Sequence, residues 1–156
     1  MEVYRVALIG HRTLSPACPI EKRLEELVRQ LLLEKEYVEF YIGRNGDFDI
    51  LAASVIKRLQ KAVGTENSSL ILVLPYHNKD EEYYENYYDE ICFPIEENNH
   101  FKSAITKRNQ WMIEQADLVV SYVERPSGGA AKALRYAEQH GIKTINLASQ
   151  EETEEE

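Results

Sequence analysis

The sequence contains only two cysteines among its 156 residues, and this scarcity excludes several kinds of site. Cys18 and Cys92 lie far apart and belong to no CxxC or cysteine–histidine spacing, so no metal site is expected. The histidines share no metal-ligand spacing either. We therefore expect free thiols, no disulfide, no bound metal and no cofactor.

Long apolar runs are also missing from the sequence. No stretch approaches the roughly 18 apolar residues that are needed to cross a bilayer. The first ten residues, "MEVYRVALIG", have an acidic residue at position 2 and a short apolar run, which is unlike a signal peptide. These two absences predict a cytoplasmic protein without a membrane partner.

Positive charge is in short supply, because the formal net charge is -9. Much of the excess lies in the tail "QEETEEE" (residues 150–156), which has no apolar residue to bury and is predicted to be disordered. A second acidic cluster spans residues 80–97. Such a surface repels duplex phosphates, so we expect no duplex nucleic-acid partner. The binding of a small anionic ligand in a local positive pocket remains an open alternative.

Strand and helix patterns alternate over residues 1–149, which predicts a single domain. The predicted strands, all rich in apolar residues, are 3–10, 37–43, 69–75, 117–123 and 143–148. The predicted helices are 20–36, one starting near 49, 101–115 and 128–140. Residues 76–99 break this rhythm with five tyrosines among many carboxylates. This insertion is interpreted as a short helix near 81–88 followed by a loop, and a lid, a partner surface and a packed excursion all remain open.

The alternation favours an α/β fold, namely a Rossmann-like three-layer α/β/α sandwich. Right-handed crossovers place about five parallel strands in the order 3-2-1-4-5. In such sheets a ligand binds outside the carboxyl ends of the strands, where the strand order reverses. The predicted reversal lies between the first and fourth strands, so the loops at Gly10 and at residues 126–129 should face each other.

Candidate ligand residues follow the first two strands. Gly10, His11 and Arg12 close the first strand, and the arginine provides a planar fork for a phosphate or carboxylate. Gly43 opens the loop "GRNGDFD" after the second strand, where Asp47 or Asp49 can cap the next helix. Asp49 is therefore read either as a cap or as a ligand contact.

The second half of the chain supplies the other candidates. Arg108 lies beside the apolar stripe of its predicted helix, and Asn109 follows it. A half-buried arginine needs an anionic partner, which is either Asp117 or a ligand. The stretch "SGGA", formed by Ser127, Gly128, Gly129 and Ala130, opens a helix after an apolar strand, where backbone N–H groups and the helix dipole favour an anion. Close packing of the helix on the sheet explains the same glycines.

Together these motifs resemble the SLOG superfamily. The stretches are "LIGHR", "GRNGDFDILAA", "KRNQWMIEQADLVVSYV" and "SGGAAKALRYAEQHGIKTINL", and the similarity covers residues 3–147. The superfamily includes DprA/Smf-type domains and the LONELY GUY phosphoribohydrolases, and the sequence is most similar to its YpsA-like bacterial branch. The resemblance implies a Rossmann-like fold that binds a nucleotide or a nucleotide derivative, with the phosphate at the glycine pair.

The chain departs from the LONELY GUY signature PGGxGTxxE in an informative way. Gly128 and Gly129 match its first two glycines, but Lys132 stands for the threonine and Arg135 for the catalytic glutamate. A cation cannot replace the carboxylate that stabilises an oxocarbenium-like transition state. The sequence therefore argues against this activity, although it leaves enzymatic function undecided.

Three functions remain open at this stage. The first is a nucleotide-binding protein that acts as a ligand sensor. The second is an N-glycosidic hydrolase, or an enzyme resembling the nucleoside deoxyribosyltransferases, with Asp49 or Glu124 as the acid. The third is an interaction protein that acts through the tyrosine-rich insertion. A homodimer is the assembly considered.

Overall fold

The computed structural model describes residues 2–15, 19–44, 46–77, 79–96 and 100–149. The predicted disordered tail and Cys18 lie outside these residues. The strands are β1 (Val3–Gly10), β2 (Tyr37–Ile42), β3 (Ser68–Val73), β4 (Glu90–Cys92), β5 (Leu118–Tyr122) and β6 (Lys143–Asn146). The helices are α1 (Ile20–Glu34), α2 (Asp47–Val63), α3 (Glu81–Tyr87), α4 (Phe101–Gln115) and α5 (Gly129–Gln139).

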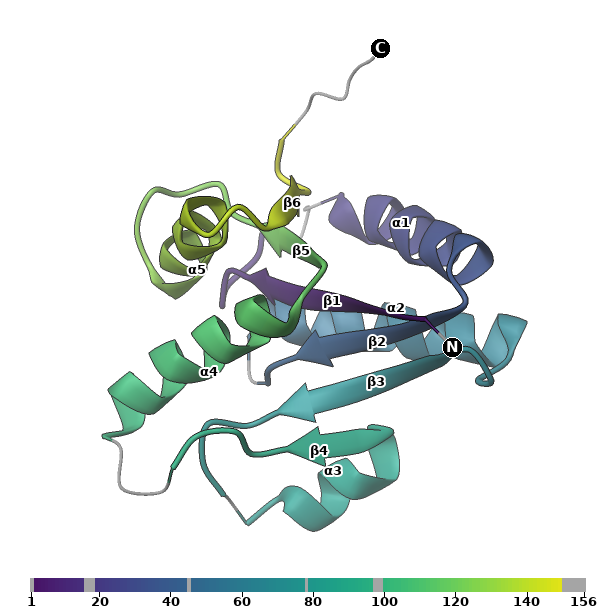
Figure 1. The fold of residues 1–156 in the computed structure, drawn as a ribbon, viewed down its shortest axis with the longest axis horizontal. Coiled ribbons are helices and arrows are strands. Elements are labelled where there is room, and N and C mark those ends of the chain that lie inside the picture. The colour runs from purple at the N-terminus through teal and green to yellow at the C-terminus, as the bar shows by residue number, and fades with distance from the viewer. Residues whose placement is uncertain (1, 16–18, 45, 78, 97–99, 150–156) are drawn as a thin grey trace.

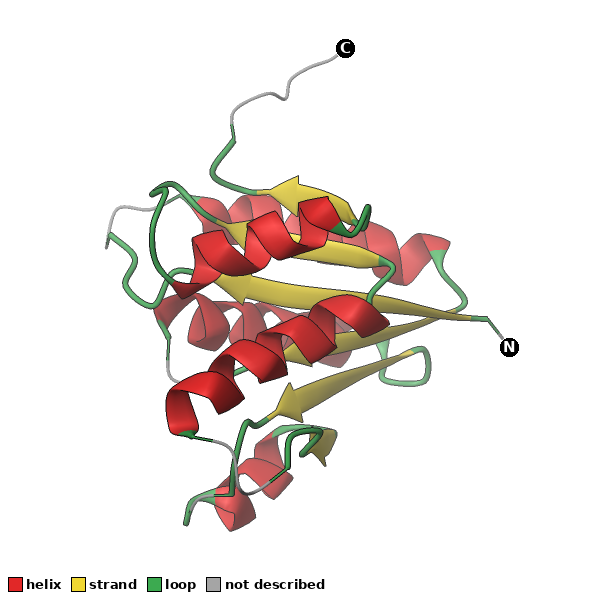
Figure 2. Ribbon diagram, turned by 60° about the vertical axis from the view of Figure 1, so that its left-hand side comes forward, coloured by secondary structure: helices red, strands yellow, loops and turns green. Residues whose placement is uncertain are grey.

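The strands form one parallel sheet in the order β4-β3-β2-β1-β5-β6. The predicted Rossmann-like α/β class and the predicted order of five strands are confirmed, and β4 adds a sixth strand at one edge. The strand order reverses between β1 and β5, as expected from the sequence. Helices α4 and α5 lie on one side of the sheet, as Figure 1 and Figure 2 show.

Alternation along β1 divides the core into two layers. Val6 and Leu8 pack into a cluster with α1 and α2, whereas Ala7 and Ile9 face the cluster formed with α4 and α5. Helix α5 approaches its face of the sheet through small buried residues, which are Ala130, Ala133 and Ala137. The small side chains therefore permit the close helix–sheet packing that the sequence suggested.

The tyrosine-rich insertion is part of the fold. Tyr84 and Tyr88 are buried in the core cluster that α1 and α2 share, and β4 extends the sheet beside β3. Tyr83, in contrast, is exposed. The sequence did not predict β4, because three residues beginning with a glutamate carry too little alternation to mark a strand. Its pairing with β3 is decided by tertiary packing.

The search for membrane spans gives a limited result. Within the part of the chain that the structure describes, no helix has both the length and the apolar character that a bilayer crossing requires.

Candidate functional site

A cavity of about 620 Å³ lies at the carboxyl ends of the central strands. Its walls come from the residues that follow β1, β2, β3 and β5, and from α4 and the start of α5. This is where open parallel sheets bind ligands, and the volume suits a small molecule. All the candidate ligand-binding residues named from the sequence line it: Gly10, His11, Arg12, Gly43, Asp49, Arg108, Asn109, Ser127, Gly128, Gly129 and Ala130. Their binding of a ligand stays a prediction.

The start of α5 forms one wall of the cavity. Gly128 is the N-cap residue, with φ 98° and ψ 172°, a conformation that is essentially restricted to glycine. The first intrahelical bond runs from the Lys132 N–H to the Gly128 carbonyl at 3.1 Å. The amides before Lys132 therefore have no partner within the helix, and the N-cap glycine has no side chain to cap them. Free N–H groups and the helix dipole at such a position favour an anion.

Arg108 of α4 lines the same cavity, with only 8% of its surface exposed. Its Nη1 donates to the Val73 carbonyl at 2.9 Å, and its Nε donates to the Asn109 side chain at 2.9 Å. The guanidinium rests directly on Gly43, where an added Cβ would lie 2.8 Å from Nη1. Gly43 thus makes room for the guanidinium of Arg108, and its contact with a ligand stays a prediction.

Burial lowers the pKa of Arg108, and the nearby Asp49 opposes that shift. The partner that the sequence offered inside the chain was Asp117, and this prediction is wrong. The Asp117 carboxylate instead accepts from the Arg5 backbone N–H at 2.9 Å. The contacts of Arg108 among the described residues use only some of the N–H groups of its guanidinium, so further donors are available to a ligand.

Asp49 is the carboxylate of the cavity. Helix α2 starts two residues earlier than expected, so Asp49 lies in its first turn and its carboxylate accepts from the N–H of the N-cap residue Gly46. Burial raises the pKa of Asp49 to about 6, although Arg108 and Arg44 act in the opposite direction. Asp49 therefore both stabilises the start of α2 and faces the cavity.

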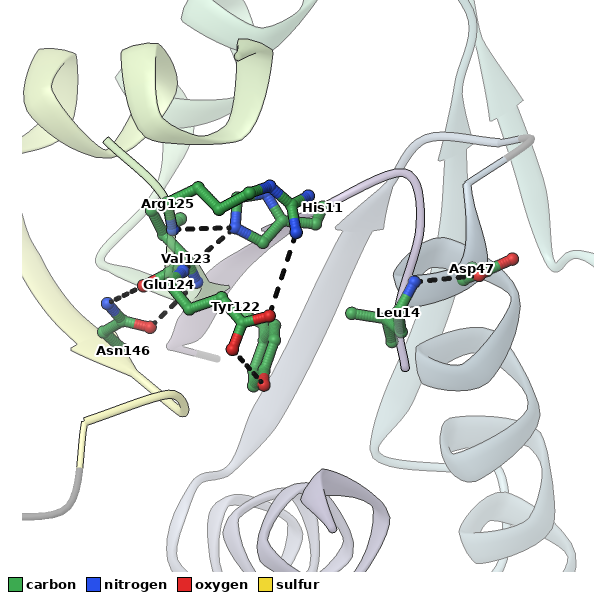
Figure 3. Close-up of polar contacts among 8 residues, drawn as sticks. All are labelled: His11, Leu14, Asp47, Tyr122, Val123, Glu124, Arg125 and Asn146. Atoms are coloured by element: carbon green, nitrogen blue, oxygen red, sulfur yellow. Dashed lines mark hydrogen bonds and ion pairs between the residues drawn. The ribbon is translucent and has the colours of Figure 1, made fainter. Parts of the chain in front are cut away.

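His11 holds the loop between β5 and α5, as Figure 3 shows. Its Nε2 accepts from the backbone N–H groups of Glu124 at 2.9 Å and Arg125 at 3.3 Å. The ring is 3% exposed, and its pKa is lowered by burial and by the nearby Arg125, with Glu124 opposing. The neutral ring with an unprotonated Nε2 is the form that fits these contacts. His11 thus positions the loop that leads to Gly128.

The loops after β1 and β2 are joined by backbone contacts. The Asp47 N–H donates to the Arg12 carbonyl at 2.8 Å, and the Asp47 carboxylate accepts from the Leu14 N–H at 2.9 Å (Figure 3). Gly10 packs against Phe48, since an added Cβ would lie 2.3 Å from the ring. The glycine at this strand end therefore makes room for the Phe48 side chain of α2, and its contact with a ligand stays a prediction.

The electrostatics of the cavity are opposite in sign to those of the whole chain. Among the described residues, its lining contains Arg12, Arg44, Arg108 and Arg125 against a single carboxylate, Asp49. The chain itself has a net charge of -9. A cationic cavity in an acidic protein concentrates small anions, because field lines focus in a concave low-dielectric site.

Sequence reasoning missed several residues of the cavity. Arg44 and Arg125 could have been found, since each adjoins a residue already chosen at a strand end. The Nε of Arg44 is buried without a hydrogen-bond partner among the described residues, and its guanidinium lies 5.1 Å from the centre of the Tyr84 ring. Tyr76 and Phe101 carried no usable signal, because they belong to the irregular insertion and to the exposed start of α4.

Comparison of the sequence gave no relatives: no protein-family model matches it, and no curated protein sequence does. Comparison of the structure, in contrast, found similar solved structures. DNA processing protein A from Helicobacter pylori, described by its single-stranded DNA binding mode, has a TM-score of 0.62 at 16% identity, over 90% of this chain and 63% of that one. DNA processing protein A (DprA) from Streptococcus pneumoniae has 0.53 at 15%, over 93% and 59%.

A molybdenum cofactor binding protein from the phototrophic bacterium Rippkaea orientalis is also similar, with a TM-score of 0.59 at 20% identity, over 94% of this chain and 77% of that one. The chain spans about three fifths of the two DNA processing proteins. All three structures are at most 20% identical to this chain, so they show a shared fold, and this agrees with the fold that the sequence resemblance implied.

The expectation about nucleic acid is corrected by the same comparison. The acidic net charge predicted no duplex nucleic-acid partner, yet a protein of this fold is described as binding single-stranded DNA. Net charge is a poor guide here, because four arginines and the carboxylate of Asp49 line the described part of the cavity although the chain as a whole is acidic. Charge alone therefore does not exclude nucleic acid as a partner of this fold.

Proposed function

We propose that this protein binds a nucleotide or a nucleotide derivative in the cavity at the strand-order reversal, and that it acts as a ligand sensor. The observation that carries the proposal is the four-arginine lining of a cavity that also contains the uncapped start of α5. Such a combination of backbone N–H groups, a helix dipole and guanidinium forks suits a phosphate.

The lining of the cavity combines polar and apolar surface, and this favours a nucleotide over a free phosphate. Arg125, Gly128 and Gly129 supply polar surface, whereas Ile105 and Met112 of α4 supply apolar surface. Tyr76 and Phe101 also line the cavity and are 43% and 53% exposed. Aromatic faces of this kind stack on bases without demanding a particular one. We place the phosphate at α5 and the base toward the aromatic residues.

Isothermal titration of the full chain with AMP, ADP and ADP-ribose tests the proposal. The decisive variant is Gly129→Glu, which sets a carboxylate at the start of α5. An added Cβ at Gly129 meets nothing within 4 Å, so the fold tolerates a side chain there. We expect at least about a tenfold loss of affinity, the size of one charge-assisted contact.

Gly129→Ala is the matched control, because it adds the same Cβ without the charge. It should keep AMP affinity within about threefold of the unmodified chain. Absence of binding by every probe at millimolar concentration would contradict the proposal. Equal affinity of the glutamate and alanine variants would contradict the placement of the phosphate.

A hydrolytic activity is the second candidate, and one observation favours it. Asp49 faces the cavity with a pKa of about 6, so a useful fraction is protonated near neutral pH, as a general acid requires. Glu124, the other acid considered, is not among the lining residues, and its carboxylate accepts from the Tyr122 hydroxyl at 3.2 Å (Figure 3). Release of free adenine from AMP that is abolished in Asp49→Asn would support hydrolysis, and no release would remove it.

A further inference from the structure

A second cavity of about 330 Å³ lies between α4 and α5 and adjoins the first. The two cavities share Ile105, Asn109 and Gly129 in their linings, so they meet at the start of α5. Figure 2 shows α4 and α5 on the same side of the sheet, where the two helices form the walls of this cavity. A molecule bound at Gly129 can therefore extend into the second cavity without leaving the protein surface.

The second cavity is cationic as well. Lys132 and Arg135 of α5 line it, and its described lining contains no carboxylate. The Nη1 of Arg135 donates to the Pro126 carbonyl at 3.0 Å, and this contact leaves the other N–H groups of the guanidinium available to a ligand. With a rise of 1.5 Å per residue, these cations follow Gly129 by about 4.5 Å and about 9 Å along the helix. They are spaced for a second anionic group beyond the first phosphate.

The remaining lining of the second cavity offers surface to an uncharged unit. Ala133 and Tyr136 lie on the same face of α5, and Thr106 and Gln110 supply polar groups from α4. The Tyr136 hydroxyl is held by the Glu114 carboxylate, which fixes the ring at the cavity wall. A base or sugar linked to the second phosphate would meet an apolar floor with hydrogen-bonding groups at its rim.

We propose that the two cavities form one extended site for a dinucleotide, with the first phosphate at Gly129 and the second bound by Lys132 and Arg135. This inference rests on the proposed function and specifies the class of ligand. It also assigns a role to Lys132 and Arg135, two of the positions at which the chain departs from the LONELY GUY signature. There the replacement of a threonine and a glutamate by cations changes the site from one for cleavage to one for a second phosphate.

Isothermal titration of the full chain with AMP and with 5′-phosphorylated diadenylate tests the inference. We expect the diadenylate to bind about tenfold more tightly than AMP, since it gains charge-assisted contacts in the second cavity. Lys132→Gln and Arg135→Gln should each reduce that advantage and leave AMP affinity within about threefold. Lys61→Gln and Arg29→Gln are the matched charge controls, because neither residue lines the described part of either cavity.

The outcomes separate the two proposals. Equal affinity for AMP and the diadenylate, or an advantage retained in both cavity variants, overturns the dinucleotide site and leaves nucleotide binding intact. Failure of both probes to bind overturns the proposed function and this inference together. If AMP affinity is lost in Arg135→Gln alone, the loop at Pro126 has moved, because Arg135 donates to the Pro126 carbonyl. The result for Lys132→Gln then decides whether the second phosphate is bound in the second cavity.

Discussion

Gly43→Ala should destabilise the protein through the side chain of Arg108. The added Cβ would lie 2.8 Å from Nη1, 3.0 Å from Cζ and 3.2 Å from Nη2 of that arginine. These distances are too short for a stable contact, so the guanidinium must move. Because it is buried and its Nη1 donates to the Val73 carbonyl at 2.9 Å, movement breaks that hydrogen bond.

The size of the effect follows from the bond that is lost. A hydrogen bond made by a charged group contributes about 1.5–3 kcal/mol, and we expect the free energy of unfolding to fall by this amount. For a chain of this size each kcal/mol lowers Tm by about 2–4 °C. The same substitution at Gly129 meets no atom within 4 Å and should change Tm little. The two glycine-to-alanine variants therefore isolate the contact with Arg108.

Urea unfolding of Gly43→Ala, Arg108→Met and the double variant measures the coupling. Since the alanine acts only by displacing the guanidinium, its cost should nearly vanish once the arginine is gone. A cost below about 0.5 kcal/mol in the single variant, within the range of ordinary surface changes, would refute the reasoning. So would an undiminished cost of the alanine in the Arg108→Met background.

Three further predictions concern neighbouring groups. Ionisation of Asp49, whose pKa is about 6, adds a negative charge to the cavity, so affinity for sulfate should fall between pH 5 and pH 7, and Asp49→Asn should remove this dependence in calorimetric titrations. The pKa of His11 is lowered in the folded protein, so the stability should be lost as pH falls below 6.5. His11→Phe should abolish this dependence of Tm on pH in thermal melts. It should also cost about 1–3 kcal/mol for each N–H left without an acceptor. Gly10→Ala should cost about 1–3 kcal/mol in urea unfolding through its clash with Phe48, and Phe48→Leu should relieve part of it.

The sequence predicted the architecture because the relevant signals are local. Apolar runs mark the strands, 3.6-residue spacing marks the helices, and the order of the elements then restricts the parallel sheet to few topologies. The prediction for α4, residues 101–115, matches its observed bounds. Since the carboxyl ends of parallel strands share one edge, the sequence also placed the candidate residues around one point.

The sequence could not predict what each of those residues contacts. Arg108 donates to a carbonyl 35 positions away, and His11 accepts from amides more than 110 positions away. The short strand β4 and the second cavity arise likewise from segments that meet only in the folded chain. By itself, the sequence determined the fold class and the edge of the sheet at which its candidate residues gather. Only the tertiary structure decided which glycines make room for a neighbouring side chain and which face open space, because that depends on atoms distant along the chain.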